Sequence, residues 1–232
     1  MCTVTFFPLN KEDFVLTSTR DVPFLREKAD FPKKYKEDGV DLFYPKDREA
    51  GGSWIGSSDK KRLICLLNGG FRNHQQKEFY VKSRGIIVKD LLKVDDITLA
   101  CKEIDLENVE PFTMVIVEWG FHLFLFEFVW DGDQKHLKIL PKEPRIWSSS
   151  TLYSDEMKAM RNNWFENWLL KLDVESSKFE IAKESILEFH HKAGVGDPKI
   201  DVIMKRSKVG TVSITQVSKK GNELLWNYEE IL

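Results

Sequence analysis

Two segments near the start of the chain have the composition of paired β-strands. Residues 1–7 and 14–21 are rich in β-branched and aromatic side chains, and the residues between them suit a turn. A hairpin that turns at residues 10 and 11 pairs residues whose numbers sum to about 21 to 23. In this prediction Cys2 faces residues 19–21, so a thiol, a guanidinium and a carboxylate would share one small volume.

A cysteine at position 2 can become the first residue of the mature chain. Because Cys2 is small, methionine aminopeptidase can be expected to remove Met1 and leave Cys2 with a free α-amine. An α-amine with a pKa of about 7.7 to 8.0 can take the proton of a thiol with a pKa of about 8.5. Arg20 would favour the thiolate, and Asp21 would orient the amine or hold Arg20. The alternative is a buried structural cysteine at the start of a strand.

Four short motifs follow one another in a distinctive order. They are Met1-Cys2-Thr3, Arg20-Asp21, Gly51-Gly52-Ser53-Trp54-Ile55-Gly56 and Leu67-Asn68-Gly69. In this order they resemble the family of transport and Golgi organisation protein 2, which has an Asn-Arg-Asp-Glu motif. That family is similar to the N-terminal-nucleophile hydrolases, particularly the penicillin V acylase and bile salt hydrolase branch. The resemblance extends over nearly all 232 residues and implies a four-layer αββα sandwich with Cys2 as the nucleophile.

Two of the family's motifs are incomplete in this chain. The Asn-Arg-Asp-Glu motif falls on residues 19–22, where only the central Arg20 and Asp21 are kept. A later Leu-Ser-Asn-Ser motif falls on residues 147–150, where Ser149 replaces an amide that would steady an oxyanion in the hydrolases. A hydroxyl can still donate one hydrogen bond, so Ser149 is a candidate oxyanion donor, although a weaker one than an amide.

Three further residues complete the candidate site. Asn68 lies at a strand end before two glycines; its spacing favours a plain Asn-Gly turn, and the family resemblance favours an oxyanion donor. Trp54 lies among glycines that let the backbone approach a bend or a ligand, and it is a candidate for substrate binding. Arg206, in the C-terminal strand region, is a candidate for binding a substrate carboxylate.

Length and composition limit the classes to which this chain can belong. With 232 residues, of which 42% are hydrophobic, one large domain over 1–232 is expected. Lys+Arg 35 against Asp+Glu 37 gives a net charge of -2, so neither nucleic acid nor an anionic membrane is the expected main partner. Cys2, Cys65 and Cys101 form no Cys-x-x-Cys pair and predict a reducing cytoplasm without a disulfide framework or zinc site. No signal peptide, transmembrane helix, metal or cofactor is expected.

The rest of the chain predicts groups of strands and helices. Residues 22–50 are rich in charge and proline, so we expect an irregular segment that is either a mobile lip over a site or a surface excursion. The resemblance favours a lip beside the nucleophile. Strands are expected at 51–56, 62–67, 112–119, 121–130, 137–140, 200–204, 210–217 and 224–228, and helices at 75–94, from 95 or 96 to 104, at 155–172 and at 179–191. This order predicts an α+β sandwich, in agreement with the αββα layering that the resemblance implies.

Several clusters have a structural interpretation that is favoured over a functional one. The aromatic row at 121–130 is expected in the core rather than around a flat ligand. His122 has no second ligand at metal spacing, and the pair at 190–191 lies in the last turn of a predicted helix, where cations suit the dipole. The lysines at 33–36 suit a solvated face, and the tryptophans of the 155–172 helix suit packing.

Two functions remain open at this point. The first is an N-terminal cysteine amidohydrolase acting on a small non-peptide amide, with Cys2, Arg20, Asp21, Asn68 and Ser149 in the catalytic site. The second is a non-catalytic haem or acyl-CoA binding or trafficking protein, as the family resemblance implies. A purely structural protein with a vestigial pocket is a third option. In either of the first two the partner is a small molecule, and the oligomeric state is not predicted.

Overall fold

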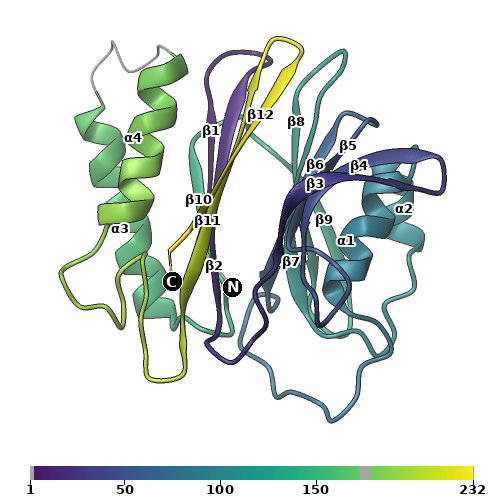
Figure 1. Ribbon diagram of the computed structural model, residues 1–232, viewed down its shortest axis with the longest axis horizontal. Helices are drawn as coiled ribbons and strands as arrows, with labels where there is room; N and C mark the ends of the chain where they lie inside the picture. The colour runs from purple at the N-terminus through teal and green to yellow at the C-terminus, as the bar shows by residue number, and fades with distance from the viewer. Residues whose placement is uncertain (1–2, 173–178, 232) are drawn as a thin grey trace. The chain divides into compact units, whose positions relative to one another are not determined.

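The computed structural model describes residues 3–172 and 179–231, and the chain divides into two compact units. We call residues 1–26 and 143–232 the terminal unit and residues 27–142 the central unit. Each unit contains an antiparallel sheet and helices that pack against it (Figure 1). This composition agrees with the predicted α+β class, and a single domain over 1–232 stays a prediction.

The sheet of the terminal unit has the strand order β10-β1-β2-β11-β12. Its strands are β1 (Thr3–Pro8), β2 (Phe14–Pro23), β10 (Arg145–Ser148), β11 (Val209–Lys220) and β12 (Glu223–Glu230). The predicted opening hairpin is confirmed, because Thr5 lies opposite Thr17 in the expected register. Cys2 lies outside the described residues.

Two features of this sheet differ from the prediction. The prediction of a strand at 200–204 is wrong. The backbone forms a turn there, in which the carbonyl oxygen of Asp197 accepts hydrogen bonds from the amides of Ile200 and Asp201. The short strand β10 was not predicted. Its four residues are too few to show an alternating pattern, and it is a strand because it pairs with β1.

Two helices, α3 (Asp155–Lys171) and α4 (Phe179–Lys192), lie against one face of this sheet (Figure 1). Both were predicted. α3 begins after Ser154, whose hydroxyl accepts a hydrogen bond from the amide of Met157. At the helix-facing side of β1, the Thr5 hydroxyl lies 2.8 Å from Nε2 of the fully buried His190. The interface between helices and sheet is therefore partly polar.

The sheet of the central unit has the strand order β3-β4-β5-β6-β7-β8-β9. Its strands are β3 (Asp30–Glu37), β4 (Val40–Lys46), β5 (Ile55–Ser58), β6 (Arg62–Asn68), β7 (Phe112–Glu118), β8 (Phe124–Trp130) and β9 (Lys135–Leu140). β5 and β6 confirm the second predicted hairpin. The aromatic row is confirmed as core over residues 125–130, although Phe121 and Phe124 at its start are exposed.

The expected irregular segment at 22–50 is wrong, since most of it forms the hairpin of β3 and β4. The turn consists of Asp38 and Gly39, both at positive φ (52° and 83°), which is the geometry of a tight two-residue hairpin. Pro32 does not prevent the strand because β3 is an edge strand whose pairing shifts between Asp30 and Lys33. The Asp-Gly pair was the missed signal.

The helices of the central unit are α1 (Arg84–Lys93) and α2 (Ile97–Glu103). α1 is shorter than the predicted helix at 75–94, because Ser83 caps its first turn by accepting a hydrogen bond from Gly85. Gly85 approaches Gly52 so closely that a Cβ on Gly52 would lie 2.3 Å from the Gly85 carbonyl carbon. Gly52, two residues before Trp54, therefore serves a close backbone contact with α1.

Arg62 joins the helices of the central unit to its sheet. Its side chain is fully buried and donates to Glu118 at 2.8 and 2.5 Å and to the carbonyl oxygens of Leu91 and Val94, both at 2.7 Å. Carbonyl groups at a helix end have no partner within the helix, so the guanidinium satisfies them. Removing it would also leave Glu118 without its cation.

We expect Arg62→Met to lower the free energy of unfolding by about 3–5 kcal/mol, because it leaves a partly buried carboxylate unpaired. Lys60→Met is the matched control, since Lys60 pairs with the exposed Asp95 and its loss should cost less than about 1 kcal/mol. Urea unfolding of both variants measures the difference. Equal losses would contradict this role of Arg62.

His190 should make stability depend on pH. Burial lowers the pKa of His190 to about 3, below its value of about 6.5 in an unfolded chain. Between these values the unfolded chain binds more protons, so stability falls as the pH falls. From pH 7.5 to 5.5 we expect the histidine to account for a loss of about 1.4 kcal/mol in the free energy of unfolding.

His190→Gln should remove this part of the pH dependence, measured by urea unfolding across the range. His191→Gln is the control, because His191 is at the surface beside Glu229 and should not have the same effect. A His190→Gln variant with the slope of the unmodified protein would contradict the assignment.

Candidate functional site

A buried carboxylate organises the end of the terminal sheet where β1 begins. Asp21, in β2, is 2% exposed. Its Oδ1 accepts a hydrogen bond from the Thr211 hydroxyl at 2.7 Å, and its Oδ2 accepts one from the Tyr153 hydroxyl at 2.5 Å. Thr211 reaches Asp21 because the two residues pair directly, just before a register shift in β11. Both carboxylate oxygens are therefore satisfied by hydroxyl groups from other segments of the unit.

Tyr153 is held in turn by Arg161 from α3. The guanidinium carbon of the fully buried Arg161 lies 3.5 Å from the centre of the Tyr153 ring. Burial, followed by the nearby negative charge of Asp21, raises the pKa of the Tyr153 hydroxyl well above its usual value. Tyr153 consequently stays protonated and acts as a hydrogen-bond donor to Asp21.

The same network reaches the first described residue of β1. Arg161 Nη1 donates to the Thr3 hydroxyl at 2.5 Å, and the Thr3 amide donates to the Thr19 hydroxyl at 2.9 Å. Thr3 also pairs with Ser148 at the end of β10. The predicted nucleophile Cys2 is bonded to Thr3, and covalent geometry keeps their Cα atoms about 3.8 Å apart. The network therefore ends one residue from the predicted nucleophile.

Arg20 and Asp21 have different surroundings, although both were expected beside the thiol. Consecutive strand residues point to opposite faces of a sheet. Asp21 meets Tyr153, which precedes α3, whereas Arg20 is opposite Ser213 and its positive charge acts on the hydroxyl of Tyr228. The Asp21 carboxylate and the Arg20 guanidinium therefore lie on opposite faces of the sheet and do not share one volume.

Ser149 and Arg206 lie beside this network. Ser149 is buried, directly follows β10, and accepts a hydrogen bond at its carbonyl oxygen from the Tyr153 amide at 3.2 Å. Arg206 lies 5.6 Å from the Tyr153 ring and donates to the carbonyl oxygens of Leu152 at 3.1 Å and Lys199 at 3.0 Å. The predicted roles of Ser149 and Arg206 toward a substrate stay predictions.

Trp54 and Asn68 belong to the central unit. Trp54 is 2% exposed, and its carbonyl oxygen accepts a hydrogen bond from Leu66 at 2.7 Å. Asn68 ends β6 opposite Phe112, and Gly69 after it has a φ of 83° and donates from its amide to the carbonyl oxygen of Pro111 at 2.9 Å. Their catalytic and binding roles stay predictions. Within residues 3–172 and 179–231, no three His, Cys, Asp or Glu side chains gather as metal ligands.

Sequence reasoning missed Thr211, Tyr153 and Arg161. Arg161 could have been suspected, because it occupies the apolar face of α3 at helical spacing from Phe165, where a charged residue needs a buried partner. Tyr153 and Thr211 gave no such signal. Each of them is more than 130 residues from Asp21 in the sequence, and only the folded chain brings them into contact.

Comparison with known proteins identifies the family. The family model described as Transport and Golgi organisation 2 matches residues 1–215. The chain belongs to the Transport and Golgi organisation 2 family. This confirms the family that the sequence motifs suggested. A comparison with curated proteins found no match for the chain.

Three of the solved structures that match this chain are an acid amidase, a bile acid hydrolase and an acylase. The Caenorhabditis elegans N-acylethanolamine-hydrolyzing acid amidase ortholog has 9% identity and a TM-score of 0.58, covering 93% of this chain and 92% of that one. A mutant conjugated bile acid hydrolase from Clostridium perfringens has 8% identity and a TM-score of 0.48, covering 100% and 92%. Penicillin V acylase from Agrobacterium tumefaciens has 9% identity and a TM-score of 0.46, covering 99% and 86%.

The likeness to the acid amidase shows the fold, and it confirms the predicted fold class, which resembles that of the N-terminal-nucleophile hydrolases. Among the described helices, none is long and apolar enough to span a membrane.

The Tyr153 hydroxyl should contribute measurably to stability. We expect Tyr153→Phe to lower the free energy of unfolding by about 1–3 kcal/mol, because a buried carboxylate oxygen loses its donor. Tyr80→Phe is the matched control, since the Tyr80 hydroxyl accepts one hydrogen bond from Lys77 in an exposed loop and should cost less than about 0.5 kcal/mol. Chemical denaturation measures both, and equal effects would contradict the network.

Proposed function

We propose that this protein is an N-terminal cysteine amidohydrolase that cleaves a small non-peptide amide. The observation that carries the proposal is the buried network from Asp21 through Tyr153 and Arg161 to Thr3. Such a network fixes the chain next to position 2, and fixed geometry is what a nucleophile requires. Membership of the family and the amidase-like fold support the same conclusion.

The proposed reaction needs Cys2 as the first residue. Its sulfur forms a bond to the amide carbonyl carbon while the thiol proton passes to the α-amine of the same residue. The tetrahedral intermediate then breaks its C–N bond, and the leaving amine takes that proton. Water hydrolyses the resulting thioester and restores the thiol. We assign Asp21 to orienting the amine, Arg20 to favouring the thiolate, and Ser149 with Asn68 to the oxyanion.

An N-acyl amide is the first substrate class to test, because the amidase with the similar fold acts on N-acylethanolamines. A series of N-acyl-7-amino-4-methylcoumarins with increasing acyl length reports cleavage by fluorescence. The sample must lack Met1, which intact mass establishes, since an amide nitrogen at Cys2 cannot act as the base.

We expect Cys2→Ala to lower kcat by at least about 1,000-fold, because no other group replaces the attacking sulfur. Cys101→Ala is the matched control and should keep its turnover, because Cys101 is buried in the central unit. The rate should rise with pH through about 7.7 to 8.0 as the α-amine loses its proton.

Equal turnover by Cys2→Ala and the unmodified protein would contradict the mechanism. Absence of amide cleavage in Met1-free protein, together with saturable binding of haem by Soret absorbance or of acyl-CoA by calorimetry, would favour the carrier function instead.

A further inference from the structure

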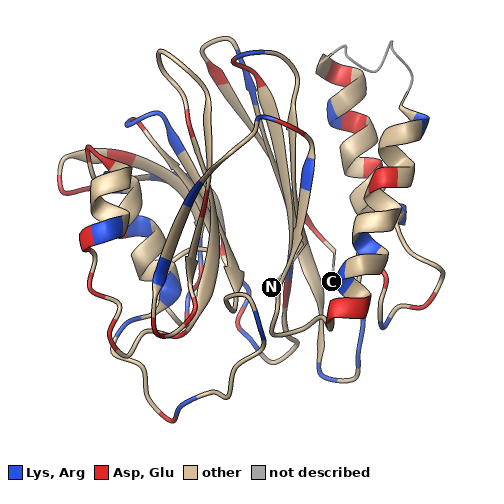
Figure 2. Ribbon diagram, turned by 180° about the vertical axis from the view of Figure 1, so that it is seen from behind, with Lys and Arg blue, Asp and Glu red and all other residues tan. Residues whose placement is uncertain are grey.

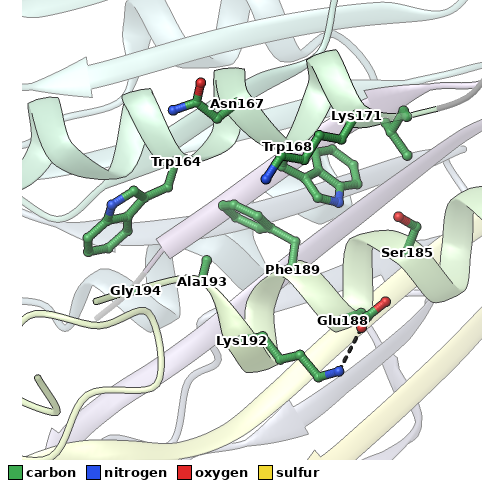
Figure 3. A pocket seen from close by; sticks show the side chains of 11 residues that line it. Trp164, Asn167, Trp168, Lys171, Ser185, Glu188, Phe189, Lys192, Ala193 and Gly194 are labelled. Atoms are coloured by element: carbon green, nitrogen blue, oxygen red, sulfur yellow. Dashed lines mark hydrogen bonds and ion pairs between the residues drawn. The ribbon is translucent and has the colours of Figure 1, made fainter. Parts of the chain in front are cut away.

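A groove of about 510 Å³ lies between α3 and α4 of the terminal unit, on residues that the proposed hydrolase does not use. Its aromatic lining comes from Trp164 and Trp168 of α3 and Phe189 of α4, whose side chains are drawn in Figure 3. Small-molecule sites commonly have volumes of about 300–1,000 Å³ and aromatic walls. In size and lining, the groove is therefore a candidate ligand site.

Two members of the aromatic wall, Trp168 and Phe189, are fixed by packing against other rings. The Trp168 ring lies 5.4 Å from Phe189 and 5.4 Å from Phe165, and Phe7 of β1 lies 6.0 Å away, measured between ring centres. Phe165 and Phe189 are buried. A ligand that enters the groove would not have to order these side chains, which lowers the entropy cost of binding.

The groove also carries a cation, Lys171, that has no carboxylate partner among residues 3–172 and 179–231. Acidic and basic residues are interspersed along α3 and α4 (Figure 2). Three of the four lysines of these helices form ion pairs within their own helix: Lys158 with Asp155, Lys183 with Glu180 and Lys192 with Glu188. Lys171, which lines the groove, forms no ion pair with any described residue. Among the described residues, the charged groups that line the groove are Lys171, Lys192 and Glu188, and they sum to one positive charge.

We propose that this groove binds a compact aromatic monoanion. The ring system lies against the indole rings of Trp164 and Trp168, where offset or edge-to-face contacts between aromatic rings are favourable. The anionic group pairs with the ammonium of Lys171, which no carboxylate of the described chain occupies. This site is separate from the proposed hydrolase, and either can fail without the other.

A pair of dyes with the same rings separates the aromatic and ionic contributions. 8-Anilinonaphthalene-1-sulfonate carries the anion, and N-phenyl-1-naphthylamine lacks it. By fluorescence titration and calorimetry we expect saturable binding of one sulfonate dye per chain, about two- to fivefold tighter than the neutral dye. The difference should shrink at high salt, which screens a partly exposed ion pair.

Lys171→Gln should weaken binding of the anionic dye by about two- to fivefold and leave the neutral dye unchanged. Lys158→Gln is the matched control on α3, outside the groove, and should bind both dyes as the unmodified protein does. Ser185→Trp places a large side chain in the groove from α4 and should remove the site, with circular dichroism confirming the fold.

The proposal is overturned if Lys171→Gln binds the anionic dye unchanged, or if Ser185→Trp keeps the site, because the dye would then bind elsewhere. Binding without saturation, as dyes show on exposed apolar surface, would overturn it as well. So would dye affinity that falls as protein concentration rises, because a second copy of the chain would then cover the groove.

Discussion

The structure of the terminal unit depends on how it satisfies one buried charge. An isolated carboxylate in an apolar interior is so costly that it must find donors. Asp21 finds them in hydroxyl groups from a neighbouring strand and from the segment before α3. Each donor is itself held: Thr211 by its pairing in β11 and Tyr153 by the guanidinium of Arg161. The position of α3 on the sheet and the start of β1 are thereby coupled to Asp21.

At two positions where this chain departs from the family motifs, the replacing side chain forms a hydrogen bond. The position where the family has asparagine is Thr19 here, and its hydroxyl accepts the hydrogen bond of the Thr3 amide. The position of the later family asparagine is Ser149, whose hydroxyl lies 3.1 Å from that of Thr151. In both cases a shorter polar side chain keeps a hydrogen bond within the terminal unit. In the proposed chemistry, the Ser149 hydroxyl takes the oxyanion role that the family resemblance implies for an amide.

Local patterns were sufficient to predict much of the fold. Composition, spacing or a capping residue predicted the hairpin of β1 and β2, the helices α3 and α4, and the hairpin of β11 and β12. The hairpin of β3 and β4 was missed because its prolines outweighed the Asp38-Gly39 turn signal. Pro32 is tolerated because β3 is an edge strand, and Pro45 follows the residues of β4 that pair with β5.

The site was predicted less completely than the fold. Asp21 was identified from a short motif, but its partners Tyr153 and Thr211 are remote in sequence, and nothing in their neighbours marks them. Residue adjacency was also misleading, because Arg20 and Asp21 are neighbours in the chain yet point to opposite faces of the strand. Contacts of this kind follow from the assembled sheet and not from any local pattern.

The central claim is that residue 2 is a free, activated N-terminal thiol. It is tested most directly by the rate at which iodoacetamide alkylates each cysteine in protein of known intact mass. Cys65 and Cys101 are internal references, since both are buried and burial raises the pKa of Cys101 to about 12. The account predicts that Met1 is absent and that Cys2 reacts faster than both references at neutral pH. Retained Met1, or a Cys2 that reacts no faster than Cys101, would contradict it.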